Sequence, residues 1–256
     1  MLFNKDHWSK LLVDSVNQPG AIMVAYKAFH NYSLGNMMMA YWQLHLRNIP
    51  LGPINTYKGW QGLGRTVKRG EKAITLCMPV TVKQKDDDTD DAKRFTIFVE
   101  KPRWFVLAQT EGEDQPTELS SPEWSAERAL AKLDITQVPF DLLEGNTQGY
   151  ARKRTIAINP VAQVPHKTRF HELGHIVLGH TKEADFEDSP DLTRNLREVE
   201  AESVALLCLE SLDLPGSEFC RGYIQNWIKG DVIPEKSAQR IFKAANTILT
   251  AGANNG

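Results

Sequence analysis

The feature that most constrains this chain is the short stretch RFHELGHIVLGH at residues 169–180. Its apolar residues recur at helical spacing, which predicts an α-helix. On a helix His171 and His175, four positions apart, leave the same face, so both imidazoles can bind one zinc ion. Glu172 then lies beside the metal without being a ligand. There it can take a proton from a water whose pKa the metal lowers to about 7 and pass it to a leaving amine.

The alternative for this stretch is a surface helix with two solvated histidines. Gly174 argues against it, because a glycine inside a helix costs about 1 kcal/mol relative to alanine. A small residue is useful where the helix must approach a strand or a ligand closely. The pattern therefore favours a metal site over a solvated surface.

A third protein ligand is expected from a second helix at residues 194–211, RNLREVEAESVALLCLES. Glu198 and Glu202 are four apart and share a face, whereas Glu200 is rotated by roughly 200° from Glu198. The other residues of this helix are mostly apolar, so its carboxylates need a partner, and a metal ion supplies one. We expect Glu198 to be the ligand and Glu202 to accept a hydrogen bond that orients a histidine ring. The reversed roles stay open.

Two further residues near the motif carry alternatives. His180 resembles the third histidine of metzincins, but it stands five rather than six residues after His175, so we interpret Gly179 and His180 as the helix end. Tyr223 either packs against Trp227, one helical turn away, or points into the cleft as a catalytic residue that stabilises a developing oxyanion.

Composition limits the class of protein. Three cysteines without a CxxC pair indicate a reducing compartment, and we expect all three to be buried small hydrophobes. No apolar run nears the roughly 18 residues that a membrane span needs, and the first ten residues do not form a signal peptide. The sequence thus predicts a soluble, cytoplasmic protein with no membrane partner.

Charge and turn formers divide the chain near residue 112. Residues 1–112 hold 15 Lys and Arg against 10 Asp and Glu, whereas residues 113–256 hold 15 against 22. Five of the first ten acids lie in the single run DDDTDD, so the rest of this half is basic and suits a polyanionic partner. We predict a first domain at 1–112, a linker at 113–122 and a second domain at 123–256.

Periodicity in the first domain predicts two helices followed by an antiparallel sheet. The helices are expected at residues 5–16 and 34–47. Strands are expected at residues 73–80, 94–99 and 103–109. The acidic loop 84–93 is expected to be a solvated hairpin tip, since it lacks the glycine and distal glutamate of an EF-hand calcium loop.

Between the helices and the strands lies a basic, aromatic stretch, INTYKGWQGLGRTVKRGEK. Exposed aromatic rings stack on bases and cations follow phosphates, which is how proteins bind single-stranded DNA without reading its sequence. A core tryptophan under a solvated basic turn is equally compatible with this composition. The candidate DNA-binding residues are Tyr57, Lys58, Trp60, Arg65, Lys68, Arg69 and Lys72.

In the second domain, we predict helices at residues 122–133 and 237–251 and strands at 140–143 and 154–158. A strand directly before the histidine helix is placed to run along the cleft and hold an extended peptide by its backbone. Tyr150 either lines this cleft or packs against its wall.

Taken together, these motifs resemble a known family. FHNYSLGN, YKGWQGLGRTVKRGEKAI and FVLAQTEG are similar to the N-terminal domain of ArdC-type antirestriction proteins. HELGH, EVEAESVALL and YIQNW are similar to the zincin-like metallopeptidase domain that follows it in that family. The resemblance covers nearly the whole chain, and the run DDDTDD looks like an insertion. The resemblance to the family also supports Glu198 as the metal ligand.

The resemblance implies an α+β protein with two domains: an N-terminal helix-plus-antiparallel-sheet domain that binds single-stranded DNA and a C-terminal zincin-like metallopeptidase domain. It further implies a protein of plasmids and conjugation that protects incoming DNA from restriction. One hypothesis is a zinc-dependent hydrolase with an unknown protein substrate. The other is a DNA-binding shield whose zinc site is structural or vestigial. A peptidase that cleaves a repressor is a third possibility, against which the first domain argues.

Overall fold

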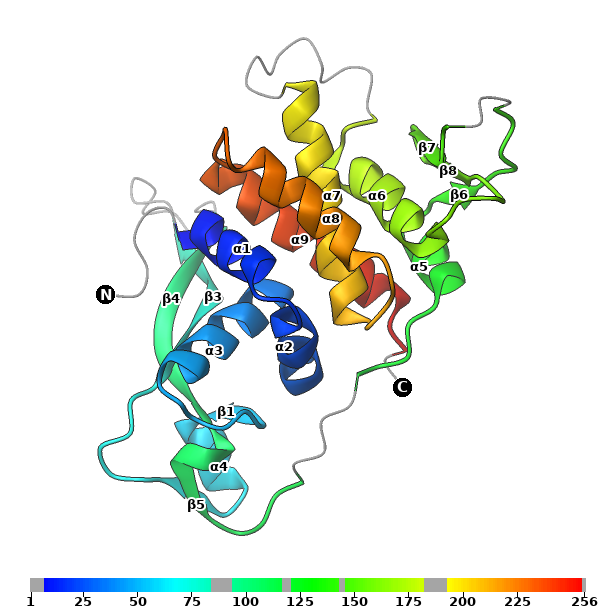
Figure 1. The fold of residues 1–256 in the computed structure, drawn as a ribbon. Helices are drawn as coiled ribbons and strands as arrows, with labels where there is room; N and C mark the ends of the chain where they lie inside the picture. Colours follow the sequence, from blue (N-terminus) through cyan, green and yellow to red (C-terminus); the bar gives the residue numbers. More distant parts are fainter. Residues whose placement is uncertain (1–6, 84–93, 117–120, 143–145, 182–192, 255–256) are drawn as a thin grey trace. The chain divides into compact units, whose positions relative to one another are not determined.

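The computed structural model describes residues 7–83, 94–116, 121–142, 146–181 and 193–254. Helices and strands are mixed along the chain, so the predicted α+β class is confirmed (Figure 1). The chain divides into two compact units: residues 1–35 with 120–256, and residues 36–119. These units differ from the predicted domains, because residues 7–35 pack with the carboxyl-terminal half.

The first unit is built from seven helices and a small sheet among its described residues. The helices are α1 (His7–Asn17), α2 (Ala21–Phe29), α5 (Ala126–Lys132), α6 (Pro165–Leu178), α7 (Arg194–Ser211), α8 (Ser217–Trp227) and α9 (Glu235–Gly252). The strands are β6 (Thr136–Gln137), β7 (Gly149–Arg152) and β8 (Thr155–Ile158). They lie in the order β6-β8-β7, with β6 parallel and β7 antiparallel to β8. Strand β7 is therefore an edge strand.

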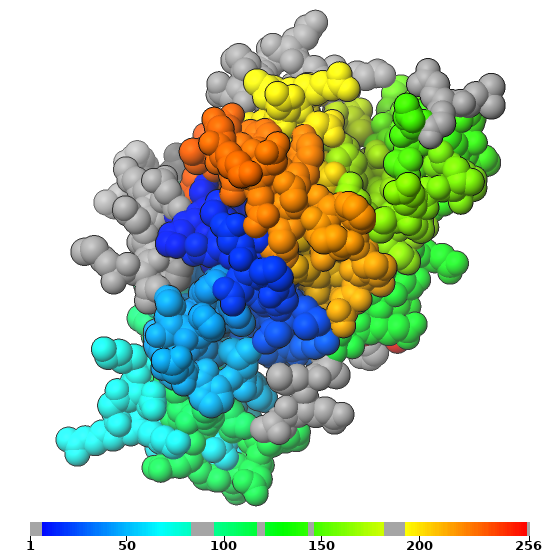
Figure 2. All heavy atoms as spheres, viewed as in Figure 1, coloured from blue at the N-terminus to red at the C-terminus, as the bar shows by residue number. Residues whose placement is uncertain are grey.

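Side-chain contacts hold α1 in this unit. The Glu235 carboxylate at the start of α9 accepts hydrogen bonds from the backbone N–H groups of Trp8, at 3.1 Å, and Ser9, at 2.9 Å. At the other end of α1, the Arg221 guanidinium of α8 donates to the Val16 carbonyl. In Figure 2 the blue amino-terminal residues lie directly against the orange residues of α8. These contacts cap helix α1 at both ends with residues more than 200 positions away, which is why the sequence does not reveal them.

Helix α7 forms the centre of the first unit. Fourteen of its eighteen residues are buried, and α6 lies alongside it (Figure 1). The two helices approach closely at Gly174, where a Cβ atom would lie 3.3 Å from Val204 Cβ and 3.4 Å from both Ala201 Cα and the Ala201 carbonyl oxygen. A Cβ atom at this position would be in tighter contact than usual, so α7 would have to move by a few tenths of an ångström to accept it.

The second unit combines helices with two antiparallel sheets. Its helical elements are most of α3 (Leu34–Leu46), α4 (Tyr57–Gly62) and the 3-10 helix η1 (Leu107–Gln109). Its strands are β1 (Ile54–Thr56), β2 (Arg65–Val67), β3 (Ile74–Lys83), β4 (Arg94–Val106) and β5 (Thr110–Gly112). One sheet has the order β1-β4-β3 and the other pairs β2 with β5.

Two side-chain amides join α3 to the backbone of β3. The Gln43 amide donates to the Thr75 carbonyl at 2.8 Å and accepts from the Thr75 N–H at 2.9 Å. The Asn36 amide makes the same pair of bonds with Cys77, at 2.9 and 2.8 Å. Because β3 is an edge strand, these amides satisfy backbone groups that a further strand would otherwise bind.

The predicted β3–β4 pairing is confirmed, but the separate third strand at 103–109 is wrong. Strand β4 runs without a break from Arg94 to Val106 and η1 follows it. Pro102 is tolerated inside β4 because the pairing with β3 shifts there, between Ile74 and Thr75, and because the paired part of β1 begins only at Trp104. The predicted loop 84–93 lies outside the described residues.

Other predictions met mixed outcomes. The helices expected at 5–16, 34–47, 194–211 and 237–251 are present within a few residues, and α5 begins after its cap Ser125. Helices α2 and α4 were not expected. Residues 140–142 form no strand, residue 143 lies outside the described residues, and β7 begins further along the chain at Gly149.

All three cysteines are free, and Cys208 and Cys220 are buried, but Cys77 is half-buried rather than buried. Within the described ranges, no helix is long and apolar enough to cross a bilayer.

The close approach of α6 and α7 makes a stability prediction. Replacing Gly174 with valine forces the helices apart and should lower the free energy of unfolding by about 1–3 kcal/mol. Gly222, inside α8, is the matched control, because a Cβ atom there meets nothing within 4 Å. Gly222→Ala should raise the free energy of unfolding by about 0.5–1 kcal/mol through helix propensity. Urea denaturation measures both, and equal effects of the two variants would contradict the packing described here.

Candidate metal centre

Helix α6 presents the two motif histidines and then stops abruptly. Pro165 occupies its first turn, where a missing N–H is harmless. At the other end Gly179 adopts the left-handed conformation with φ 83°, and the backbone N–H of His180 donates to the carbonyl of His175 at 2.8 Å. The predicted helix end at Gly179 and His180 is confirmed. The turn brings the His180 side chain back beside the His175 ring.

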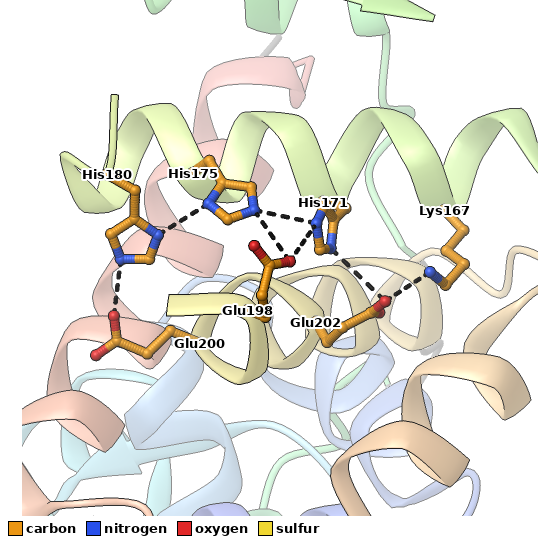
Figure 3. Close-up of polar contacts among 7 residues, drawn as sticks. All are labelled: Lys167, His171, His175, His180, Glu198, Glu200 and Glu202. Carbon is orange, nitrogen blue, oxygen red and sulfur yellow. Dashed lines mark hydrogen bonds and ion pairs between the residues drawn. The ribbon is translucent and has the colours of Figure 1, made fainter. Parts of the chain in front are cut away.

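Three side chains from α6 and α7 converge on one point (Figure 3). The Nε2 atoms of His171 and His175 are 3.0 Å apart. Oxygen Oε2 of Glu198 lies 3.4 Å from His171 Nε2 and 3.7 Å from His175 Nε2. The structure therefore brings together the three residues that the sequence predicts as ligands.

The spacing of these atoms fits a metal ion. Ligands held at about 2.0–2.1 Å in a tetrahedron are separated from one another by about 3.3 Å. The three observed separations, 3.0, 3.4 and 3.7 Å, scatter around that value. Three donors occupy one face of such a tetrahedron and leave the fourth position free for water or a substrate group. Two neutral imidazoles and one carboxylate are also a common donor set for catalytic zinc.

Electrostatics keep Glu198 in the form that a ligand needs. Contacts with the His171 and His175 imidazoles hold the pKa of the Glu198 carboxyl well below its usual range. Its side chain is 38% exposed, whereas those of the two histidines are 16% and 13% exposed. The metal position is thus shielded by the helices and approached from the side of Glu198.

Glu172 is buried next to these three residues, at 8% exposure. Burial raises the pKa of its carboxyl from 4.5 to about 7, and the negative charges of Glu198 and Glu202 add to the rise, while His175 acts in the opposite sense. A carboxyl that titrates near neutral pH can both accept and return a proton under physiological conditions.

Glu202 lies behind His171. Its Oε1 atom is 3.7 Å from His171 Nδ1, which is longer than a hydrogen bond, and 2.7 Å from Lys167 Nζ. Burial acts to lower the pKa of Lys167, but the charge of Glu202, the hydrogen bond to it and the charges of Cys220 and Glu172 together raise that pKa. The predicted neighbour of a histidine ring is in place, yet His171 Nδ1 has no hydrogen-bond partner.

A second polar chain lies behind His175, and the sequence analysis did not anticipate it. His175 Nδ1 is 3.0 Å from His180 Nδ1, and His180 Nε2 is 2.8 Å from Glu200 Oε2 (Figure 3). Glu200 has no exposed surface. Burial lowers the pKa of His180, although the hydrogen bond to Glu200 opposes that shift. The helical wheel correctly places Glu200 off the metal face, but only the turn at Gly179 brings a histidine to it.

Hollows open on both sides of the candidate metal position, and edge strand β7 with the preceding loop forms one wall of both. One hollow extends along β7 towards Arg152 and Thr181, and the other extends towards Gln148 and Phe219. Both contain His171, Glu172 and Glu198 in their lining. Gly149 lies against Thr168 and Glu172, so β7 begins directly beside the buried carboxyl.

The two tyrosines singled out from the sequence differ in position. Tyr150 lines the hollow along β7 and its hydroxyl donates to Asp141 at 2.6 Å. Tyr223, on α8, is 43% exposed and lines neither hollow. Burial and the charges of Glu198 and Glu202 raise its pKa, which keeps the hydroxyl protonated. Its predicted role as an oxyanion donor stays a prediction.

The candidate DNA-binding residues of the second unit fall into two groups. Of the two alternatives for Trp60, the structure shows the core tryptophan and not the exposed DNA-binding ring: Trp60 is 1% exposed and its indole N–H donates to the Phe105 carbonyl at 2.8 Å. Arg65 is also buried, and its guanidinium binds Thr110 and the Gly112 and Glu113 carbonyls. Both side chains stabilise the fold. The remaining members of the set are exposed: Tyr57, Lys58, Lys68, Arg69 and Lys72.

The comparisons with known proteins agree with this fold. Residues 5–121 match the family model described as the N-terminal domain of anti-restriction factor ArdC. The metal-free crystal structure of the antirestriction ArdC protein from the R388 plasmid is similar, with a TM-score of 0.60 and 19% sequence identity over 97% of this chain and 95% of that one. The Mn(II)-bound structure of the R388 protein gives 0.57 and 19%, over 99% and 100%. A search of curated proteins found no match.

The buried Glu172 predicts a pH-dependent cost in metal-free protein. Its folded pKa is about 7 against 4.5 for an unburied carboxyl, so the folded state binds more protons between these values and stability falls as pH rises through them. Above pH 7 the ionised group costs about 3 kcal/mol. In chelator-treated protein Glu172→Gln should therefore raise the free energy of unfolding at pH 8 and have little effect at pH 4. A variant that is no more stable than the wild type at pH 8 would contradict the burial argument.

Proposed function

We propose that this chain is an ArdC-type antirestriction protein, that it binds single-stranded DNA through its amino-terminal domain, and that it hydrolyses peptide bonds at a divalent metal ion held by His171, His175 and Glu198. The observation that carries the hydrolytic part is the triangle of three donor atoms with a buried carboxyl of raised pKa beside it. In this proposal the carboxyl-terminal half is a zincin-like metallopeptidase.

The reaction divides between the metal ion and the protein. When bound, the ion would supply Lewis acidity, which lowers the pKa of water and polarises a carbonyl group. Glu172 would accept the proton of the attacking water and then deliver it to the nitrogen of the leaving amine. Its raised pKa suits both transfers, because neither direction is strongly uphill near neutral pH.

The substrate proposed for this site is an extended polypeptide segment. Among the described residues no strand pairs with the outer edge of β7, and an extended chain added there would run past the metal through both hollows. The Tyr223 hydroxyl, kept protonated by its raised pKa, would donate a hydrogen bond to the developing oxyanion. The identity of the cleaved protein follows from none of these contacts.

We propose zinc as the ion. Two imidazoles, one carboxylate and an open position are typical of catalytic zinc. The R388 ArdC protein has been crystallised with Mn(II), and the same donor set accepts both ions. Elemental analysis of protein purified without added metal decides between them.

For DNA binding, the proposed contacts are the exposed residues that remain after Trp60 and Arg65 are excluded. Lys68, Arg69 and Lys72 lie in the turn between β2 and β3 and are all exposed. Tyr57, 46% exposed, offers an aromatic face to a base. This group joins a stacking ring to several cations, the combination that non-specific single-strand binding requires.

Glu172→Gln tests the peptidase. The variant keeps the shape of the side chain and all three proposed ligands but cannot transfer a proton. Cleavage of labelled casein, measured with and without single-stranded DNA, should fall by at least about 100-fold while metal content stays equal to the wild type. Glu127→Gln, an exposed carboxylate on α5, serves as the matched control. Wild-type protection of incoming DNA by Glu172→Gln with metal bound would favour a DNA-binding shield and contradict a catalytic role.

Salt dependence tests the DNA surface. Each cation that neutralises a phosphate contributes about 0.7 to the slope of log affinity against log salt on a single strand. Replacing Lys68, Arg69 and Lys72 with alanine should therefore reduce the slope by about 2. The control replaces Lys132, Lys229 and Lys236, three exposed lysines of the other unit. An unchanged slope in the first variant would place the DNA elsewhere.

A further inference from the structure

Behind the candidate metal position a chain of polar contacts runs from the metal ligand His175 into the protein core. His175 Nδ1 contacts His180 Nδ1 at 3.0 Å, and His180 Nε2 contacts Glu200 Oε2 at 2.8 Å (Figure 3). The chain ends at Arg240 of α9, whose Nη1 atom is 3.9 Å from Glu200 Oε1. Arg240 also donates to the Leu178 carbonyl at 2.7 Å, in the last turn of α6.

These contacts determine which ring nitrogens carry protons. A carboxylate only accepts hydrogen bonds, so the bond to Glu200 places a proton on His180 Nε2. In a neutral ring His180 Nδ1 then carries a lone pair, and the 3.0 Å contact requires His175 Nδ1 to be the donor. His175 Nε2 is left without a proton. That nitrogen is the one that faces His171 and Glu198.

Burying Glu200 is costly, which argues that it has a purpose. Its side chain has no exposed surface, and a buried carboxylate is destabilising unless charges and hydrogen bonds compensate it. His180 compensates one oxygen, whereas the other faces Arg240 at a distance longer than a hydrogen bond. If Glu200 served only to hold the helices together, a packed apolar residue would do so without the desolvation cost of a buried carboxylate.

We propose that Glu200 and His180 are positioning residues that hold the His175 ring in its Nδ1–H tautomer, with Nε2 ready to bind the metal ion. This inference rests on the metal site of the proposed function, not on peptidase activity. A carboxylate that accepts a hydrogen bond from a ligating histidine also raises the basicity of that ring, so its metal-binding nitrogen donates its electron pair to the metal more strongly. Here a second histidine lies between the carboxylate and the ligand, so buried Glu200 would act on the metal through His180 and His175.

The other histidine ligand lacks such support. Within the described part of the chain, His171 Nδ1 has no hydrogen-bond partner; the Glu202 carboxylate is 3.7 Å away and bound to Lys167. The two ligands therefore differ before any metal binds. We expect His175 to be the fixed ligand and His171 the one whose ring adjusts when the ion enters.

The tautomer is measured in chelator-treated protein by nitrogen-15 NMR of the imidazole rings. Spectra at pH 8, above the ordinary imidazole pKa of about 6.5, report neutral rings. We expect His175 in the Nδ1–H form and His180 in the Nε2–H form. Free imidazole side chains favour Nε2–H, so the His175 signal is diagnostic. A wild-type His175 in the Nε2–H form would overturn the inference.

Metal affinity is measured in parallel by competition with a chromophoric chelator, using Zn2+ as the probe. Glu200→Leu removes the acceptor and should weaken Zn2+ binding by about 10- to 100-fold. Glu200→Gln keeps a hydrogen-bond acceptor without the charge, so its Zn2+ affinity should lie between that of Glu200→Leu and that of the wild type. Equal affinity of all three proteins would overturn the inference.

A variant of another buried glutamate separates positioning from stability. Glu210 lies on the same helix about 15 Å further along its axis, is also buried and pairs with Arg221. Glu210→Gln should destabilise the fold, measured as Tm of metal-free protein, and leave Zn2+ affinity unchanged. Weakening by Glu210→Gln equal to that by Glu200→Leu would show a merely structural effect and overturn the inference.

The outcomes also separate this inference from the proposed function. A wild-type protein that binds Zn2+ but cleaves no peptide would contradict the peptidase and leave the order of affinities intact. If the wild type cleaves peptides and Glu200→Leu binds Zn2+ as tightly as the wild type, only the positioning role is contradicted.

Discussion

The candidate site depends on how closely helices α6 and α7 approach one another. Gly174 permits that approach, since any larger side chain meets Val204 and the backbone of Ala201. Two of the donor atoms come from α6 and the third from α7, so the separations of 3.4 and 3.7 Å between Glu198 and the two histidines depend on this interhelical distance. The glycine between the motif histidines is therefore part of the metal geometry as well as of the packing.

The same interface concentrates buried charge in a way that a purely structural core would avoid. Glu172, Glu198, Glu200 and Glu202 all lie between or beside the two helices, and three of them are less than 10% exposed. Lys167, the histidines and Arg240 compensate part of this charge. The remaining cost, clearest in the raised pKa of Glu172, is what a divalent cation at the site would relieve. Metal binding should therefore stabilise the fold as well as enable chemistry.

The parts of this structure that sequence predicted are those set by local periodicity. The histidine spacing, the helix of Glu198 and the glycine end of α6 each follow from residues within one or two turns of each other. Trp60 and Arg65 were misjudged because composition does not distinguish an exposed aromatic or basic side chain from a buried one. Their partners, Phe105 and the 110–113 segment, lie more than 40 residues away.

The same limit applies to the support behind His175 and to the amino-terminal helix. Glu200 was set aside because it leaves the metal face of α7, and only the left-handed turn at Gly179 shows that His180 reaches it. Likewise α1 belongs to the first unit because it is bound by Glu235 and Arg221, and no local sequence pattern encodes these contacts. Long-range hydrogen bonds thus decide what the sequence leaves open.

The central claim is that one divalent ion is held between α6 and α7 by two imidazoles and one carboxylate. Anomalous X-ray diffraction from crystals of the metal-loaded protein tests it most directly. The account predicts one strong peak about 2.0–2.2 Å from His171 Nε2, His175 Nε2 and a Glu198 carboxylate oxygen. A peak coordinated instead by Glu202 or His180, or an anomalous map with no peak between these helices, would contradict it.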